Sequence, residues 1–237
     1  MKKKVLVLVA IINLGICQHN IYAQTSDNIG MVISAEGQVS AISKDNQERS
    51  LQRRSSIYLN DKIITKGASK AQLRLVDDSI VIVQPESEFF VSEFSFNKNI
   101  PDKNKYVGNL VKGALINISG QSEAKDYQVK SPLVTIAVRG TSFATRLNKT
   151  ITNQEVYVSQ GHVSVDQICK NIAGKCESNP VNIGADQQFN SAVVNLAKGK
   201  IDIKPTTSAN LLSEGGIAGQ GLMTQSGGVA VRCKAKR

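Results

Sequence analysis

Residues 131–143 read Ser-Pro-Leu-Val-Thr-Ile-Ala-Val-Arg-Gly-Thr-Ser-Phe. Apolar and β-branched residues dominate this stretch as far as Val138, which is typical of a strand that packs into a core. Arg139 then places a charge in the strand, and a buried charge is costly unless it is paired. We therefore expect Arg139 to meet a carboxylate or backbone carbonyls inside the fold, with a ligand-facing guanidinium as the alternative. The candidate carboxylate partners are Asp77, Asp78 and Glu155. Gly140 and Thr141 indicate a β-bulge that redirects the strand.

The same alternation of short apolar runs and turn residues recurs between residues 29 and 190, and no long segment carries a helical apolar period. Strand, glycine, strand patterns surround Gly37, Gly113 and Gly161 and predict hairpins. The sequence therefore predicts an all-β domain of roughly a dozen strands, arranged as two packed antiparallel sheets that share one core. Tryptophan is absent and aromatic residues make up 5% of the chain, so valine, isoleucine and leucine must build that core.

The N-terminus has the three-part layout of a secretory signal peptide. Lys2–Lys4 form a basic head, an apolar run covers residues 5–16, and the small residue Ala23 offers a cleavage point. The run is shorter than the about 20 apolar residues that a membrane-spanning helix needs, and no later stretch qualifies. We expect residues 1–23 to be removed, leaving a periplasmic or secreted protein without a transmembrane span.

Cys17 lies where a lipidation motif would place its cysteine. Ile16 is too bulky for the position before a modified cysteine, so lipoprotein anchoring is disfavoured. Loss of the leader removes three lysines and lowers the formal charge from +10 to +7. A basic exported protein favours an anionic glycan or an acidic protein face over nucleic acid as its partner. The basic cluster of Lys44, Arg49, Arg53 and Arg54 is expected to be a solvated loop.

Cys169 and Cys176 flank a polar segment that resembles a hairpin loop. In an oxidising compartment these two cysteines are expected to form a disulfide, which leaves Cys233 without an assigned partner. After Ala197 the composition becomes rich in glycine and polar residues. The sequence therefore predicts one β domain over residues 24–197 and a mobile, glycine-rich tail over residues 198–237.

The run of Arg139, Gly140 and Thr141, followed closely by Phe143, resembles the signature of FecR domains. Further similarities occur in the family's order along the chain. They comprise Gly37–Val39, Asp61–Gly67, Ala71–Ser79, Val156–Val165, and Gly184 with Gln187 and Gln188. Asp78 stands where the family typically has glycine, and we expect Asp78 to adopt the positive φ of that turn. The resemblance implies a jelly-roll-like antiparallel β-sandwich with a regulatory, protein-binding role.

Well-known FecR regulators carry a cytoplasmic segment and a spanning helix before this domain, whereas only a cleavable leader precedes it here. We therefore expect a stand-alone, exported FecR-like module that binds an envelope protein and takes part in envelope signalling, without direct control of a sigma factor.

No catalytic, cofactor-binding or metal-binding set emerges from the sequence. His162, the single histidine of the mature chain, is expected to be an exposed turn residue. One alternative function is a polysaccharide-binding jelly roll, which would need exposed aromatic side chains. The candidate stacking residues are Tyr58, Tyr106, Tyr127 and Tyr157. Another alternative is a structural surface subunit linked through Cys233 or the tail.

Overall fold

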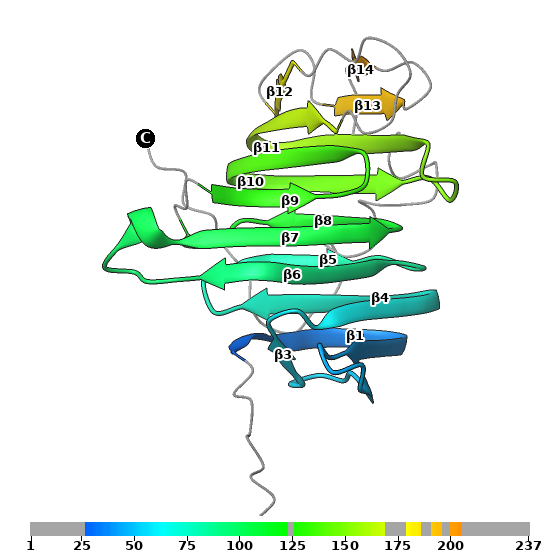
Figure 1. The fold of residues 1–237 in the computed structure, drawn as a ribbon, viewed down its shortest axis with the longest axis vertical. Helices are drawn as coiled ribbons and strands as arrows, with labels where there is room; N and C mark the ends of the chain where they lie inside the picture. The colour runs from blue at the N-terminus through cyan, green and yellow to red at the C-terminus, as the bar shows by residue number, and fades with distance from the viewer. Residues whose placement is uncertain (1–26, 123–125, 169–178, 186–190, 196–199, 205–237) are drawn as a thin grey trace, which may run out of the picture.

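A computed structural model of the chain describes residues 27–122, 126–168, 179–185, 191–195 and 200–204 (Figure 1). The predicted signal peptide, the three cysteines of the mature chain and residues 205–237 lie outside the described residues. The elements are β1 (Asn28–Ile42), β2 (Glu48–Ser50), β3 (Ser56–Tyr58), β4 (Lys62–Leu75), β5 (Ile80–Val83), β6 (Glu88–Ser95), η1 (Pro101–Lys103), β7 (Lys105–Lys112), β8 (Ala114–Ile118), β9 (Asp126–Lys130), β10 (Val134–Leu147), β11 (Asn153–Gln167), β12 (Val181–Gly184), β13 (Ser191–Asn195) and β14 (Lys200–Lys204). The all-β prediction is confirmed, and the single turn of 3-10 helix, η1, is the one helical element in the described part of the chain.

The strands form a single sheet that closes on itself. One layer runs β4–β5–β8–β10 and the other runs β4–β6–β7–β9–β10, so β4 and β10 belong to both layers. The two layers are therefore joined at both ends, whereas the sequence predicted two separate packed sheets. All of the pairings are antiparallel except that between β7 and β9, which is parallel. This pair differs from the expected all-antiparallel sandwich.

β4 and β10 can serve both layers because each of them bends sharply. In β10, residues 135–137 pair with β9 and residues 142–146 pair with β8. The bend between them contains Gly140 at φ 62°, and the register shifts there as the predicted bulge requires. In β4 the corresponding bend contains Gly67 at φ 56°. Such positive φ values favour glycine, because a Cβ crowds the backbone in that region.

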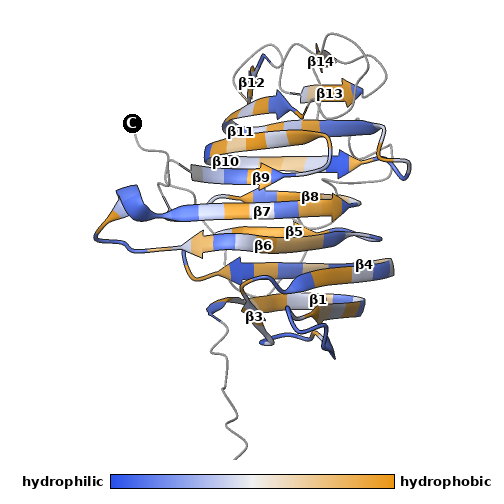
Figure 2. Cartoon of the chain, in the orientation of Figure 1, coloured by the Kyte–Doolittle hydropathy of each residue, from blue (hydrophilic) through white to orange (hydrophobic). Residues whose placement is uncertain are grey.

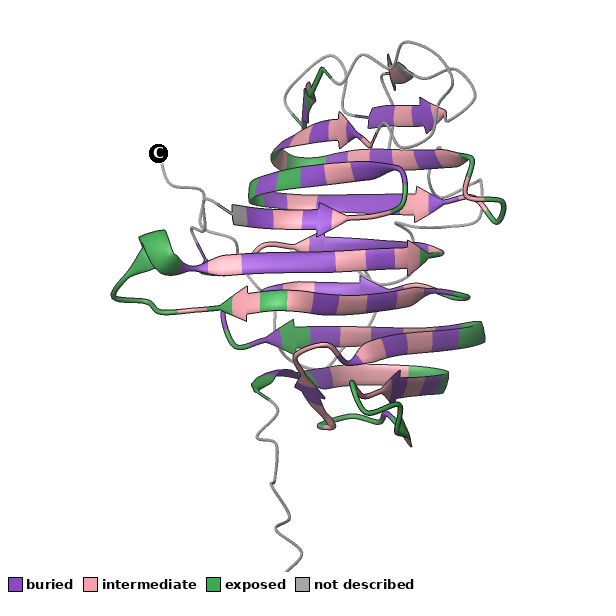
Figure 3. Ribbon diagram, viewed as in Figure 1, coloured by how far each residue is buried: buried purple, intermediate pink, exposed green. Residues whose placement is uncertain are grey.

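The neighbouring long strands follow these bends. β1 pairs along β4 and bends at Gly37, while β11 pairs along β10 and bends at Gly161. Figure 3 shows the exposed bends of β1 and β4 at one edge of the molecule and those of β10 and β11 at the opposite edge. The flattened ring thus presents two similar bends that face away from each other.

The space between the two layers holds the main hydrophobic core. Alternate residues of each strand point into it, and valine, isoleucine and leucine supply most of its side chains, as the composition predicted. Phe89, Phe143 and Tyr106 are the largest fully buried members. Figure 2 shows the resulting alternation of apolar and polar residues along the strands. Burial of this apolar surface is the main force that holds the layers together.

The sheet extends beyond the ring at both ends. β2 and β3 pair with β1, and β12 and β13 pair with different parts of β11. β14 pairs with β13 along its whole length, although it lies past residue 197, where the composition predicted the domain to end. Within the described ranges, no helix is long and apolar enough to cross a membrane.

The two glycines of the β10–β11 bend should differ in their tolerance of a side chain. A Cβ on Gly161 would lie 2.8 Å from the carbonyl oxygen of Gly140, whereas a Cβ on Gly140 would meet nothing within 4 Å. Both glycines have positive φ, so the backbone strain of an alanine alone should cost about 1–2 kcal/mol of unfolding free energy at either position, which is the full cost expected for Gly140→Ala. Gly161→Ala should cost about 3 kcal/mol or more, because the clash adds to the backbone strain. Urea unfolding of both variants measures the difference, and equal losses would show that the two backbones do not approach this closely in solution.

Candidate functional site

The bend of β10 divides the Arg-Gly-Thr stretch between the surface and the interior. Arg139 and Gly140 are exposed, and Arg139 lies opposite the exposed residue His162 on β11. Thr141 and Phe143 are buried, with 3% and 1% of their surfaces exposed. The backbone amide of Thr141 donates to the Ser119 hydroxyl at 3.2 Å. Thr141 and Phe143 therefore anchor the bend, while Arg139 is displayed at its outer edge.

The expectation that Arg139 is buried against a carboxylate is wrong. Its candidate partners bond elsewhere: Asp77 accepts from Ser79, Asp78 accepts from Arg74, and Glu155 accepts from Arg146. The physical reason is the alternation of β10, which buries Val134, Ile136 and Val138 and places Arg139 on the outer face, next to the bend. His162 is exposed as expected, although it lies at the bend of a long strand, directly after Gly161, and not in a hairpin turn.

The opposite bend is built in a similar way. Lys66, Gly67 and Ala68 are exposed, and Ser69 is buried. The Ser69 hydroxyl accepts from the backbone amide of Gln38 at 2.7 Å, which fastens β4 to β1 at this bend. Gly67 lies inside the continuous strand β4. Lys66 thus offers an internal comparison for Arg139, since each cation directly precedes a bend glycine.

A chain of buried polar groups crosses the core beneath the β4–β5 turn. The Ser79 hydroxyl donates to Asp77 Oδ2 at 2.7 Å and accepts from the Tyr127 hydroxyl at 3.3 Å. Asn117 Nδ2 donates to the Tyr127 hydroxyl at 3.2 Å, and the Tyr106 hydroxyl donates to Asn117 Oδ1 at 3.3 Å. The rings of Tyr106 and Tyr127 stack with centroids 4.2 Å apart. These contacts link strands of both layers, so the network holds the ring together internally.

Burial also sets the protonation of these groups. Desolvation raises the pKa of Asp77, partly offset by hydrogen bonds from the hydroxyl and amide of Ser79. Desolvation likewise raises the pKa of Tyr106 and of Tyr127, so both phenols stay neutral and able to donate. Asp78, in the turn beside Asp77, has φ 66°, as expected for a residue in a glycine-favouring position.

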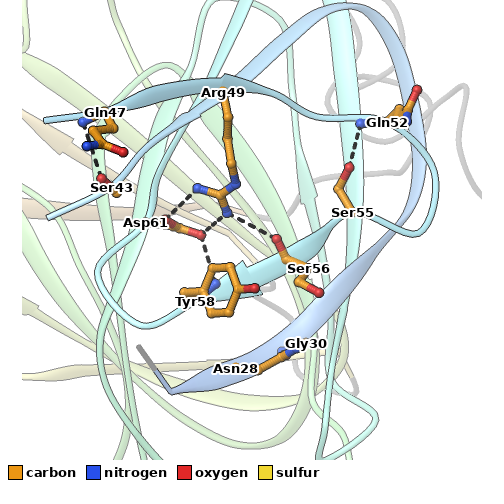
Figure 4. Close-up of polar contacts among 10 residues, drawn as sticks. All are labelled: Asn28, Gly30, Ser43, Gln47, Arg49, Gln52, Ser55, Ser56, Tyr58 and Asp61. Carbon is orange, nitrogen blue, oxygen red and sulfur yellow. Dashed lines mark hydrogen bonds and ion pairs between the residues drawn. The ribbon is translucent and has the colours of Figure 1, made fainter. Parts of the chain in front are cut away.

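A second polar cluster fixes β2 and β3 against β1 (Figure 4). Arg49 Nη1 donates to Asp61 Oδ1 at 3.0 Å, and Arg49 Nη2 donates to Asp61 Oδ2 and, at 3.1 Å, to the carbonyl of Ser56. The Tyr58 amide donates to Asp61 Oδ2 at 2.8 Å, and the guanidinium lies 5.3 Å from the centre of the Tyr58 ring. The hydrogen bond to Asp61 raises the pKa of Arg49.

The predicted basic cluster is therefore divided. Lys44, Arg53 and Arg54 are exposed, as expected for a solvated loop, whereas Arg49 is part of the framework. Sequence reasoning missed this role because Arg49 and Asp61 are twelve residues apart and meet only when β2 and β3 fold back beside β1.

Comparison with known proteins agrees with this geometry. The family model described as "FecR protein" matches residues 61–164, a range that includes both β4 and β10 and the whole Arg-Gly-Thr bend. Residues 61–164 therefore match the family that the sequence resembles. The match begins at Asp61, the partner of Arg49, and ends within β11 beyond His162.

Two crystal structures of a candidate anti-sigma factor from Parabacteroides distasonis are similar in fold to this chain. Both have a TM-score of 0.50 and 17% sequence identity. One match covers 63% of this chain and 62% of that chain, and the other covers 65% and 64%. The similarity thus spans less than two thirds of the neighbour's length. No curated protein sequence matches the chain.

The raised pKa of Asp77 predicts a pH dependence with a definite sign. The folded state holds the proton more tightly than the unfolded state, where the pKa keeps its ordinary value of 3.8. The stability contributed by the protonated carboxyl is therefore present in full below that ordinary value and is lost as the pH rises through the folded pKa. The unfolding free energy of the wild type, relative to that of Asp77→Asn, should therefore fall as the pH is raised from below 3.8 to neutrality.

Urea unfolding across this pH range measures the dependence, with Asp45→Asn in an exposed turn as the control for loss of one carboxylate. If the unfolding free energy of the wild type, relative to that of Asp77→Asn, increased with pH, the account would be contradicted, because the fold would then stabilise the ionised form of Asp77.

Arg49 should matter far more to stability than its neighbour Arg53. Arg49→Ala leaves the Asp61 side chain, which is 2% exposed, without its guanidinium, and should cost about 3 kcal/mol of unfolding free energy. Arg53→Ala removes an exposed cation and should change the unfolding free energy by less than about 0.5 kcal/mol. Chemical denaturation of both variants provides the test, and similar small effects would show that the Arg49–Asp61 pair does not hold β2 in place.

Proposed function

We propose that this protein is a non-enzymatic, exported FecR-type module that binds an acidic face of an envelope protein through the bend at Arg139 and Gly140. Binding there would regulate signalling or assembly in the envelope. The proposal includes cleavage of residues 1–23, a periplasmic or secreted location, and a Cys169–Cys176 disulfide. It also includes a mature β domain that begins at residue 24.

The observation that carries the proposal is the exposure of Arg139 in a bend whose other residues are fixed. Phe143 and Thr141 are packed in the interior, and Gly140 and Gly161 provide the backbone geometry. Because the backbone on both sides of Arg139 is fixed in the sheet, the freedom lost on binding a carboxylate is limited mainly to that of the side chain. The formal charge of +7 expected for the mature chain also favours an acidic partner.

The buried tyrosines favour a protein partner over a glycan. A sugar-binding face needs exposed aromatic rings, yet Tyr106 and Tyr127 are 0% and 2% exposed and stack on each other. Tyr58 lies beneath the guanidinium of Arg49. Of the four candidate stacking residues, Tyr157 alone keeps a partly exposed ring without such a contact among the described residues. One ring is a poor platform for a polysaccharide.

The family and the fold neighbours support a regulatory class of function. The FecR match covers the bend, and the neighbour of known structure is described as a candidate anti-sigma factor. Control of a sigma factor is not included in the proposal, because the similarity to that neighbour extends over 62% of its length.

Affinity capture from gently crosslinked envelopes tests the role of Arg139. Arg139→Ala should reduce recovery of the partner by about tenfold, the loss expected when one ion pair of an interface is removed. Lys66→Ala, at the opposite bend, should leave recovery unchanged. Circular dichroism and unfolding should show both variants folded, because both side chains are exposed.

The outcomes separate the alternatives. A partner retained equally by the wild type and both variants would show that the Arg139 bend is not the interface. Recovery of glycan alone, by the wild type and by Arg139→Ala, would overturn the protein-partner proposal.

A further inference from the structure

The bulge at the Arg139 bend takes Thr141 out of the pairing between β10 and its neighbours. Toward β11 the register passes from Arg139 directly to Ser142, and β10 pairs with β8 from Ser142 onward. Thr141 is 3% exposed, so its backbone amide and carbonyl need hydrogen-bond partners within the protein. Another segment must therefore supply these partners.

Ser119, which directly follows β8, supplies both of them. Its amide donates to the Thr141 carbonyl at 2.9 Å, and its hydroxyl accepts from the Thr141 amide at 3.2 Å. In a regular antiparallel pair the second bond would go to a backbone carbonyl. Here the serine hydroxyl takes the place of that carbonyl, so the position of the bend depends on the side chain of residue 119.

The residues after Ser119 are held by the β4–β5 turn. The Gly120 amide donates to the buried Ser79 hydroxyl at 3.0 Å, and the Gln121 amide donates to the Asp77 carbonyl at 2.6 Å. A Cβ on Gly120 would lie 2.1 Å from the Asp77 carbonyl oxygen, so this close approach requires glycine. The segment that contains Ser119 is therefore fixed by contacts outside the bend.

We propose that Ser119 is a positioning residue for the binding surface at the Arg139 bend. Its hydroxyl holds Thr141, and Thr141 sets the position of the backbone that carries Arg139, two residues earlier. Loss of the hydroxyl leaves a buried amide without its acceptor, which favours a shift of the bend toward water. A partner that needs the original position of the bend must then bind against that preference. This inference rests on the proposed function of the bend.

The opposite bend provides a matched control. The Ser69 hydroxyl accepts from the backbone amide of Gln38 at 2.7 Å. Ser69→Ala and Ser119→Ala therefore each remove one hydroxyl that accepts one backbone amide at a glycine bend. A general loss of stability would affect both variants in the same way, whereas a positioning role would affect only the bend that loses its bond.

Amide hydrogen exchange of the folded mature chain tests whether the hydroxyl holds the bend. Ser119→Ala should increase the exchange rate of the Thr141 amide about fivefold, the effect of one lost hydrogen bond, and should leave that of the Gln38 amide unchanged. Ser69→Ala should have the reverse effect. An unchanged Thr141 rate in Ser119→Ala would overturn the proposal. Circular dichroism confirms that both variants keep their β structure.

Affinity capture from crosslinked envelopes tests whether that position matters for binding, with Arg139→Ala as the reference. Ser119→Ala should reduce recovery of the partner about fivefold, less than Arg139→Ala does, because the guanidinium is still present. Ser69→Ala should leave recovery unchanged.

The outcomes distinguish this inference from the proposed function. Full recovery by Ser119→Ala, together with reduced recovery by Arg139→Ala, would overturn the positioning role alone. Equal losses in Ser119→Ala and Ser69→Ala would also overturn it, because they would reflect a general loss of stability. Full recovery by Arg139→Ala would instead overturn the proposed function, and the positioning role with it.

Discussion

The structure depends on the ability of β4 and β10 to turn from one layer into the other without ending. Each strand pairs with one layer before its bend and with the other layer after it. Glycines at positive φ permit these bends, and the partner strands β1 and β11 bend at glycines of their own. Closure gives every strand of the ring a neighbour on each side, so the ring exposes few unpaired backbone groups that could promote aggregation.

The same bends separate the roles of the motif residues. Gly140 sets the backbone geometry, and Thr141 and Phe143 secure the strand in the interior. Arg139 is left at the surface, where it does not contribute to the core. The stretch Arg139–Phe143, which resembles the FecR signature, thus has a mainly structural role and leaves one charged side chain, that of Arg139, exposed. At the same end of the ring as the Arg139 bend, the stacked tyrosines and Asp77 add a polar network that links the layers.

Local constraints could be predicted from the sequence. Alternation of apolar residues indicated strands, the Gly140–Thr141 pair indicated a bulge, and Asp78 was expected at positive φ. Each of these depends on a few consecutive residues. The exposure of Arg139 agrees with the alternation that buries Val134, Ile136 and Val138. The sequence did not show which face was buried, because Ala137 on the outer face is apolar as well. The Arg49–Asp61 pair, the closure by β4 and β10 and the parallel β7–β9 pair all depend on contacts between distant segments.

The most direct measurement is site-specific photocrosslinking in living cells, with a photoreactive residue at Gln160 beside the Arg139 bend and, separately, at Ala68 on the opposite bend. Both positions are exposed, so the two probes differ mainly in which bend they report on. The account predicts a discrete crosslinked protein species from position 160 and none from position 68. Equal crosslinking from both positions, or a species from position 68 alone, would contradict the assignment of the Arg139 bend as the binding surface.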